Sequence, residues 1–222
     1  MVSLFRIQAL LSYYYQGQTR YDVQSPFMGT MIREVWENYD FPESRNILEK
    51  YRKDLLEDTT PIHTANFGDG TSILRNSAPT VAQIARRSSS APMDCFFYYH
   101  FSRFIQPQYI LELGTCLGIS GAYLQTGHPS SKLITIEGEL HLAVRARTLF
   151  DSICQTKPEV LIGSFSDTLD EALSHAPSFD LVFIDGDHAY DPLLRYFNHI
   201  KSKLSARSAV IIHDINWSPA MQ

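Results

Sequence analysis

One stretch of sequence decides the fold of this chain, and it reads Leu111-Glu112-Leu113-Gly114-Thr115-Cys116-Leu117-Gly118. An apolar run from Tyr109 leads into it, and a helical pattern follows from Ser120. Gly114 and Gly118 let the backbone turn tightly and approach a ligand, because glycine carries no Cβ. Free backbone N–H groups at the start of the following helix converge on the same place. The stretch therefore predicts a strand, a turn that can hold a ligand, and a helix.

Four further short runs rich in Val, Ile and Leu come after this first strand. They cover residues 133–136, 160–162, 181–184 and 209–212, with helical patterns between them. Short apolar runs without alternation are typical of strands that are buried on both faces. Alternating strands and helices predict an α/β fold with right-handed crossovers. We therefore expect a Rossmann-like, doubly wound, mainly parallel sheet of about five strands, with ligands at the carboxyl ends of the strands.

The chain before residue 107 carries helical patterns instead. One follows Ser25-Pro26, and others cover residues 46–58, 81–87 and 93–105. Ser is a common N-cap and Pro fits the first helical turn, so such pairs mark helix starts. Asp191 and Pro192 predict the start of the last helix in the same way. We expect residues 1–90 to form a helical N-terminal extension or cap, and residues 91–222 to form the Rossmann-like core.

Composition narrows the classes of partner. The chain has 222 residues with 19 basic and 24 acidic side chains, for a net charge of −5. Nucleic acid is therefore disfavoured as a partner, because binding to phosphates depends on clustered Lys and Arg. No run approaches the roughly 20 apolar residues of a membrane span. Three widely spaced cysteines are typical of free thiols in a reducing cytosol. We expect a cytoplasmic protein with a small-molecule substrate, and a homodimer stays open.

The spacing of the glycines decides between two classes of nucleotide ligand. A dinucleotide site needs a middle glycine in the pattern G-x-G-x-x-G to admit the pyrophosphate. Cys116 stands at that position, and the glycines here follow the pattern G-x-x-x-G. A nicotinamide or flavin cofactor is therefore disfavoured. A nucleoside ligand without phosphates remains compatible with the turn.

The next two strand ends carry residues suited to a nucleoside. Glu137 ends the second strand, about 20 residues after the glycine turn, where a carboxylate can accept hydrogen bonds from both ribose hydroxyls. Glu139 is the alternative for this role. Phe165 and Ser166 follow the third strand and could form an aromatic wall and a polar contact for adenine. Ser166 or Asp167 could equally cap the following helix.

Ionisable residues crowd the ends of the fourth and fifth strands. Asp185, Asp187 and His188 follow the fourth strand, and His213 and Asp214 follow the fifth. Burying such charges without a partner is costly, so a ligand or a metal is expected among them. We favour His188 as a general base, because the pKa of an unperturbed imidazole lies near neutrality.

Taken in order, these segments resemble the successive motifs of class I S-adenosylmethionine-dependent methyltransferases. The similarity is greatest to the small O-methyltransferases related to catechol and caffeoyl-CoA O-methyltransferases, and to bacterial members with an Ile-Asp-Gly-Asp-His motif. The resemblance covers roughly residues 91–216. It rests on residues 111–120, 134–137, 163–167, 179–190 and 209–214.

The resemblance implies a role for each candidate residue. Residues of the glycine turn would cradle the methionine and ribose parts of S-adenosylmethionine: Glu112, Gly114, Thr115, Gly118 and Ser120. It implies further that Glu137 holds the ribose hydroxyls and that Phe165 and Ser166 flank adenine. Asp185 would face the methionine amino group or a metal. The catalytic set would be His188, Asp185 and Asp214, with Asp187 or Asp214 orienting the imidazole.

Two departures from the family pattern matter. Metal-dependent members follow the fifth strand with Asp-Asn, whereas Asp214 is followed by Ile215 here. An apolar side chain cannot replace an oxygen ligand of Mg²⁺, so a divalent metal is disfavoured and we assign no metal ligands. Family members also continue with a helix and two more strands. This chain ends at Gln222, so we expect a truncated core that lacks the last strands.

The sequence thus predicts an S-adenosylmethionine-dependent methyltransferase that methylates a hydroxyl oxygen of a small molecule. One alternative is a truncated or non-catalytic module that binds the cofactor only. A nicotinamide-dependent oxidoreductase is a second alternative, which the position of Cys116 disfavours.

Overall fold

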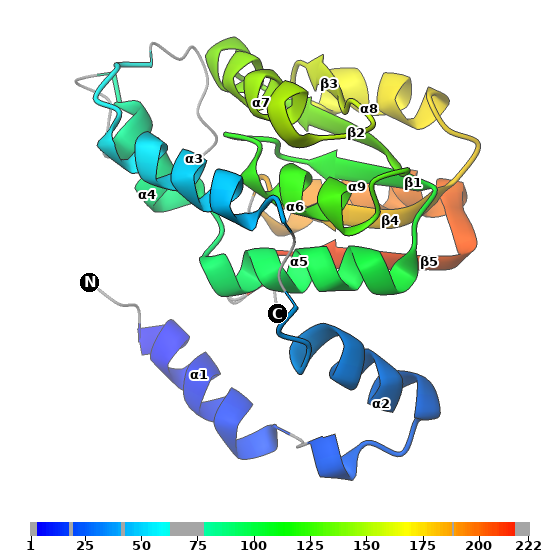
Figure 1. Ribbon diagram of the computed structural model, residues 1–222. Helices are drawn as coiled ribbons and strands as arrows, with labels where there is room; N and C mark the ends of the chain where they lie inside the picture. Colours follow the sequence, from blue (N-terminus) through cyan, green and yellow to red (C-terminus); the bar gives the residue numbers. More distant parts are fainter. Residues whose placement is uncertain (1–3, 18–19, 41–42, 63–77, 188, 216–222) are drawn as a thin grey trace.

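The computed structural model describes residues 4–17, 20–40, 43–62, 78–187 and 189–215 (Figure 1). The strands are β1 (Tyr109–Leu113), β2 (Lys132–Glu137), β3 (Glu159–Ile162), β4 (Phe179–Ile184) and β5 (Leu204–Ile212). The helices of the N-terminal part are α1 (Leu4–Gln16), α2 (Pro26–Met31), α3 (Arg45–Glu57), α4 (Val81–Ser88) and α5 (Pro92–Ile105). The remaining helices are α6 (Ile119–Gly127), α7 (Leu140–Ile153), α8 (Phe165–Ser174) and α9 (Tyr190–Ile200).

The five strands form one parallel sheet in the order β3-β2-β1-β4-β5. Leu113 at the end of β1 pairs with Ile136 of β2 and with Ile184 of β4. The carboxyl ends of the central strands therefore lie level at one edge of the sheet. The predicted Rossmann-like α/β fold with a parallel sheet is confirmed.

Neighbouring residues on each strand face opposite sides of the sheet, so each strand contributes to two hydrophobic layers. Ile110 and Phe183 pack with residues of α5, α6 and α7 on one side. Leu111 and Ile184 pack with residues of α8 and α9 on the other side. Both faces of the sheet are therefore covered, which explains why the strands read as apolar runs.

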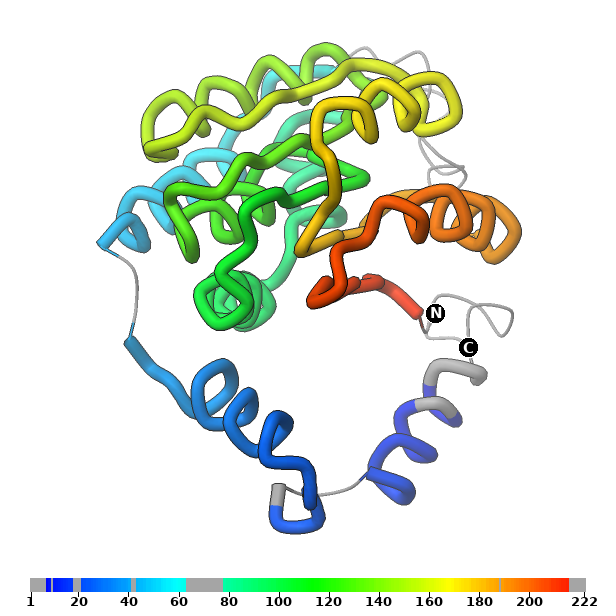
Figure 2. Tube along the Cα trace, turned by 90° about the vertical axis from the view of Figure 1, so that its right-hand side faces the viewer, coloured from blue at the N-terminus to red at the C-terminus, as the bar shows by residue number. Residues whose placement is uncertain are grey.

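The first helix, α1, lies outside this layered core. Figures 1 and 2 show α1 apart from the sheet and its covering helices. The segment that starts with α2 reaches the core through α5, because Phe27 contacts Phe104 and Trp36 contacts Phe97. A helical N-terminal part is thus present, while the predicted division at residue 90 stays a prediction. Among the described residues, no helix is both long enough and apolar enough to cross a membrane.

Two of the predicted helix starts were wrong. The helix α9 begins at Tyr190 with Ala189 as its N-cap, so Asp191 lies inside the first turn. Ser164 caps α8, because its Oγ accepts a hydrogen bond from the N–H of Asp167. The start of α2 was correct, with Ser25 at the N-cap and Pro26 in the first turn.

Candidate functional site

The turn after β1 adopts left-handed backbone conformations at three alternate positions. Gly114 has a φ of +104°, Cys116 of +48° and Gly118 of +82°. The turn presses against the end of β4, because a Cβ on Gly114 would lie 2.3 Å from the carbonyl oxygen of Asp185. Only a residue without a Cβ allows this approach. The predicted turn is therefore present, and its shape brings β1 against the end of β4.

A buried polar network holds this turn from below. The Glu112 carboxylate is fully buried and accepts hydrogen bonds from Ser120 Oγ at 2.6 Å and from Thr135 Oγ1 at 2.7 Å. The Thr135 hydroxyl also lies 2.6 Å from Thr115 Oγ1. Burial raises the pKa of Glu112 to about 7. The network joins β1, β2 and the first turn of α6, and the contact of its members with a cofactor stays a prediction.

Glu137 stands at the tip of β2, beside the turn. Its Oε2 accepts a hydrogen bond of 2.7 Å from the N–H of Cys116, and its Oε1 accepts one of 3.0 Å from the N–H of Glu139. Burial raises the pKa of Glu137. Two backbone donors thus fix the orientation of this carboxylate at the edge of the turn, next to the carboxyl end of β1.

Phe165 lies at the start of α8, close to the end of β4. A Cβ on Gly186 would lie 2.7 Å from the Phe165 ring, and the ring also packs edge-on against Tyr196 at 5.5 Å. Ser166 is exposed, and its Oγ lies 2.8 Å from Ser164 Oγ. The structure thus brings Phe165 to the same strand end as Asp185.

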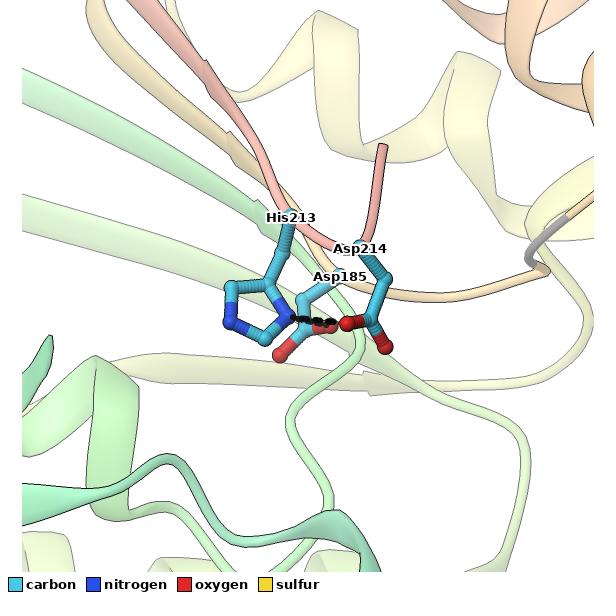
Figure 3. Close-up of side chains that lie close together, drawn as sticks. All are labelled: Asp185, His213 and Asp214. Atoms are coloured by element: carbon cyan, nitrogen blue, oxygen red, sulfur yellow. Dashed lines mark ion pairs between the residues drawn. The ribbon is translucent and has the colours of Figure 1, made fainter. Parts of the chain in front are cut away.

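Asp185, His213 and Asp214 form a compact charged group at the ends of β4 and β5 (Figure 3). The Nδ1 atom of His213 lies 3.1 Å from Asp185 Oδ1 and 3.6 Å from Asp214 Oδ1. These contacts are ion pairs rather than aligned hydrogen bonds, since Nδ1 lacks a hydrogen-bond partner with suitable geometry. The Asp185 carboxylate raises the pKa of the imidazole to about 8, and burial acts in the opposite direction.

Two members of the predicted catalytic set are thus together, Asp185 and Asp214, while His188 lies outside the described residues. The carboxylate of Asp187 accepts a hydrogen bond of 3.1 Å from the Tyr196 hydroxyl. Tyr196 lies on α9, so Asp187 is directed toward that helix in this structure.

Sequence reasoning left two residues near this group without a role. His213 was recognised at the strand end, but its contact with Asp185 depends on how β4 and β5 pair. Tyr98 of α5 is the second of these residues. It is 2% exposed and its ring lies 4.8 Å from that of Phe183, yet its hydroxyl has no hydrogen-bond partner among the described residues.

The charged group fits Mg²⁺ poorly, although its ligand atoms all lie within 4.8 Å of one another. Mg²⁺ requires near-octahedral oxygen ligands. Here the third side chain is an imidazole in contact with both carboxylates, and Ile215 follows Asp214. A proton on His213 offsets one of the two negative charges.

We therefore predict that chelation does not affect catalysis. Dialysis against EDTA, followed by assay with and without added Mg²⁺, should leave the rate of methyl transfer unchanged. The physical reason is that two carboxylates in contact with an imidazole do not offer the oxygen ligands that Mg²⁺ requires. Loss of activity on chelation, with recovery on addition of a divalent ion, would contradict this interpretation of the group.

Comparison with known proteins finds methyltransferases that are similar to the core of this chain. Residues 111–215 match the model of a family described as a methyltransferase domain. A search of curated proteins finds no match. The fold is similar to an O-methyltransferase from Bacillus cereus solved with S-adenosylhomocysteine, at 18% identity and a TM-score of 0.58, covering 84% of this chain and 71% of that one.

Two further solved structures share the fold. The methyltransferase PaMTH1 from Podospora anserina, solved with S-adenosylhomocysteine, is 16% identical with a TM-score of 0.59, covering 87% of this chain and 72% of that one. The O-methyltransferase TomG from Streptomyces achromogenes, solved with S-adenosylmethionine, is 22% identical with a TM-score of 0.56, covering 81% and 70%. These similarities show that the chain shares the Rossmann-like fold of these methyltransferases, and the family match lies within the part of the chain that forms the sheet.

Proposed function

We propose that the protein transfers a methyl group from S-adenosylmethionine to a hydroxyl oxygen of a small molecule. One observation carries the proposal: the left-handed turn after β1 presses on the end of β4, with Glu137 beside it and Asp185 behind it. The bound ligands of the similar structures support the choice of cofactor. The cofactor supplies a methyl carbon on positively charged sulfur.

The residues at the strand ends suit the parts of this cofactor. Glu137 would accept hydrogen bonds from the two ribose hydroxyls, because its carboxylate is oriented by backbone donors. Asp185 would attract the methionine ammonium group by charge. Phe165 would lie beside the adenine ring. The turn from Gly114 to Gly118 would bring backbone close to the methionine part.

Catalysis would depend mainly on the alignment of the two reactants. The acceptor oxygen must lose its proton as the new bond forms, so a nearby base contributes. His188 remains a candidate for that base from the sequence, with Asp185 and Asp214 beside the site. The charged residues at the ends of β4 and β5 therefore mark the side where the acceptor would bind.

Isothermal titration with S-adenosylhomocysteine tests cofactor binding, with NAD as the competing ligand. Formation of S-adenosylhomocysteine is then measured on a panel of phenols, catechols and hydroxy acids. Binding of S-adenosylhomocysteine and turnover on one of these acceptors are expected. Binding without turnover would favour the non-catalytic module, and binding of NAD alone would favour the oxidoreductase.

Removing the Glu137 carboxylate should weaken the binding of S-adenosylhomocysteine. We expect Glu137→Ala to raise the Kd roughly tenfold or more, the scale of a lost charge-assisted hydrogen-bond partner. Glu137→Gln keeps the shape and one acceptor oxygen, so it should give a smaller loss. Titration calorimetry measures both values.

A matched control for this experiment is Glu159→Ala. Glu159 lies at the opposite end of the sheet, at the start of β3, where it pairs with His175. Its removal should leave the Kd unchanged. An unaltered Kd in both Glu137 variants would remove the ribose role from this residue, with circular dichroism showing that each variant is folded.

A further inference from the structure

We propose that His213, oriented by Asp185, accepts the proton of the acceptor hydroxyl and is a catalytic residue of this methyltransferase. The inference rests on the proposed function and adds a base that the sequence analysis did not assign. It also limits the acceptor to a molecule without negative charge near the reacting hydroxyl.

The two residues are held together by the pairing of adjacent strands. Ile184 of β4 pairs with Ile212 of β5, and the next residues along the two strands are Asp185 and His213. The N–H of His213 donates a hydrogen bond of 3.0 Å to the carbonyl oxygen of Ile184, which fixes its backbone. The contact between the side chains is therefore a property of the sheet rather than of a loop.

The orientation of the imidazole suits a proton acceptor. Nδ1 faces the carboxylates of Asp185 and Asp214, while the ring edge with Nε2 points away from both (Figure 3). A carboxylate beside Nδ1 favours the neutral tautomer that carries its proton there. The lone pair of Nε2 is then free to accept a proton, and the carboxylate stabilises the imidazolium that forms. The side chain is 31% exposed, so a substrate can reach it.

Two buried aromatic rings lie on the inner side of His213. Phe183 is fully buried, and its ring lies 6.3 Å from the imidazole. Tyr98 packs on Phe183 and is 2% exposed. These rings support the imidazole from the core, so the acceptor must approach from the exposed side of the ring.

Negative charge surrounds the imidazole from three elements. Asp185 follows β4, Asp214 follows β5, and Asp94 lies in the first turn of α5; each raises the pKa of His213. Three carboxylates against one imidazolium repel an anionic acceptor. We therefore infer that the acceptor is an uncharged hydroxyl compound and that carboxylate-bearing analogues react poorly.

In the proposed step, proton transfer from the hydroxyl accompanies methyl transfer to its oxygen. The hydroxyl proton passes to Nε2 of His213, and the freed oxygen pair forms the bond to the methyl carbon. The bond between that carbon and sulfur breaks, and its electron pair stays on sulfur, which becomes neutral. His213 is left as an imidazolium beside Asp185 and releases its proton to water after the product departs.

The test compares pH profiles of His213→Gln and the unaltered protein on the best acceptor of the panel. For the unaltered protein, kcat/KM should rise with pH and level off near the imidazole pKa of about 8. The variant should lose this rising limb and lower kcat by about 100-fold, the scale of general base catalysis. Its affinity for S-adenosylhomocysteine should not change.

His199→Gln is the matched control, because His199 also lies 2.9 Å from an aspartate, Asp170, but belongs to the last turn of α9 and not to the ends of β4 and β5. It should keep both the rate and the pH profile. His188→Gln is measured in parallel. Loss of the rising limb in His188→Gln, with its retention in His213→Gln, would assign the base to His188 and overturn the inference.

A second measurement needs no acceptor. Titration of the histidine ring signals by NMR should show the His213 pKa above that of an ordinary imidazole, and Asp185→Asn should lower it. An unchanged His213 pKa in Asp185→Asn would show that Asp185 does not act on His213.

The acceptor class is tested separately. Catechol and 3,4-dihydroxybenzoate are compared as a pair that differs by one carboxylate, and catechol should react faster. Equal rates for the two acceptors would contradict the inferred acceptor class.

The outcomes separate this inference from the proposed function. No binding of S-adenosylhomocysteine, or no turnover on the whole panel, would overturn the proposed function and this inference with it. Turnover that is unaltered in His213→Gln would overturn the inference alone. A loss of S-adenosylhomocysteine affinity in that variant would make His213 a binding residue instead of a base.

Discussion

Gly114→Ala is expected to destabilise the fold and to abolish cofactor binding together. The new Cβ would lie 2.3 Å from the carbonyl oxygen of Asp185, which belongs to the backbone and cannot rotate away. The residue also has a φ of +104°, which strains any residue with a side chain. Such strain and overlap cost about 2–4 kcal/mol in the free energy of unfolding. Because the turn would move away from the end of β4, the affinity for S-adenosylhomocysteine should fall below detection.

Urea denaturation and titration calorimetry measure the two effects. Gly29→Ala is the matched control, since Gly29 lies in α2 with ordinary helical geometry and only a side-chain nitrogen 3.9 Å from the added carbon. Alanine at a helical glycine should stabilise the protein by about 0.5–1 kcal/mol. A Gly114→Ala protein as stable as the unaltered one would show that the turn does not press on β4.

Glu112→Ala is expected to have a comparable effect on stability for a different reason. The substitution leaves the hydroxyls of Ser120 and Thr135 without their acceptor and opens a cavity beneath the turn. Unpaired buried hydroxyls and a cavity together cost about 3–5 kcal/mol. Glu112→Gln keeps the volume and one acceptor oxygen, so it should be much less destabilising.

The pH dependence of stability distinguishes the charge of Glu112 from its volume. Its folded pKa is raised from 4.5 to about 7, so the folded state binds the proton more tightly than the unfolded state. This group therefore contributes stability at low pH, and that contribution decreases as the pH rises from 4.5 through about 7. Thermal melts across this range should show that slope in the unaltered protein and a smaller slope in Glu112→Gln. Glu171→Gln, at an exposed position on α8, should retain the full slope.

Most of the sheet could be predicted from the sequence because its strands are buried on both faces. The apolar runs at residues 109–113, 133–136 and 181–184 agree with β1, β2 and β4 within two residues at each end. β5 begins at Leu204, five residues before the predicted run. That first half contains Arg207 and three serines or alanines, and it lies partly exposed at the edge of the sheet, so no apolar pattern marks it.

The candidate site was predictable only as far as strand ends can be found. Glu137, Asp185 and Asp214 each lie at the end of an apolar run, so their positions at strand ends could be predicted, while their roles stay predictions. The contact between Asp185 and His213 depends on the order of strands, because β5 pairs with β4 rather than with another strand. The orphan hydroxyl of Tyr98 depends on helix packing over Phe183. Neither property has a local signature in the sequence.

The turn after β1 keeps its left-handed backbone conformation at a position that glycine does not occupy. Cys116 adopts a φ of +48°, so the position without the middle glycine bends in the sense that a glycine would adopt. Asparagine, aspartate and glycine tolerate this conformation best, and most other residues tolerate it at a modest cost. Relatives of this chain with cysteine, asparagine, aspartate or glycine at the position of Cys116 should form the same loop. A search for distant relatives should therefore score the alternation of left-handed backbone positions, and not the letters of a fixed glycine pattern.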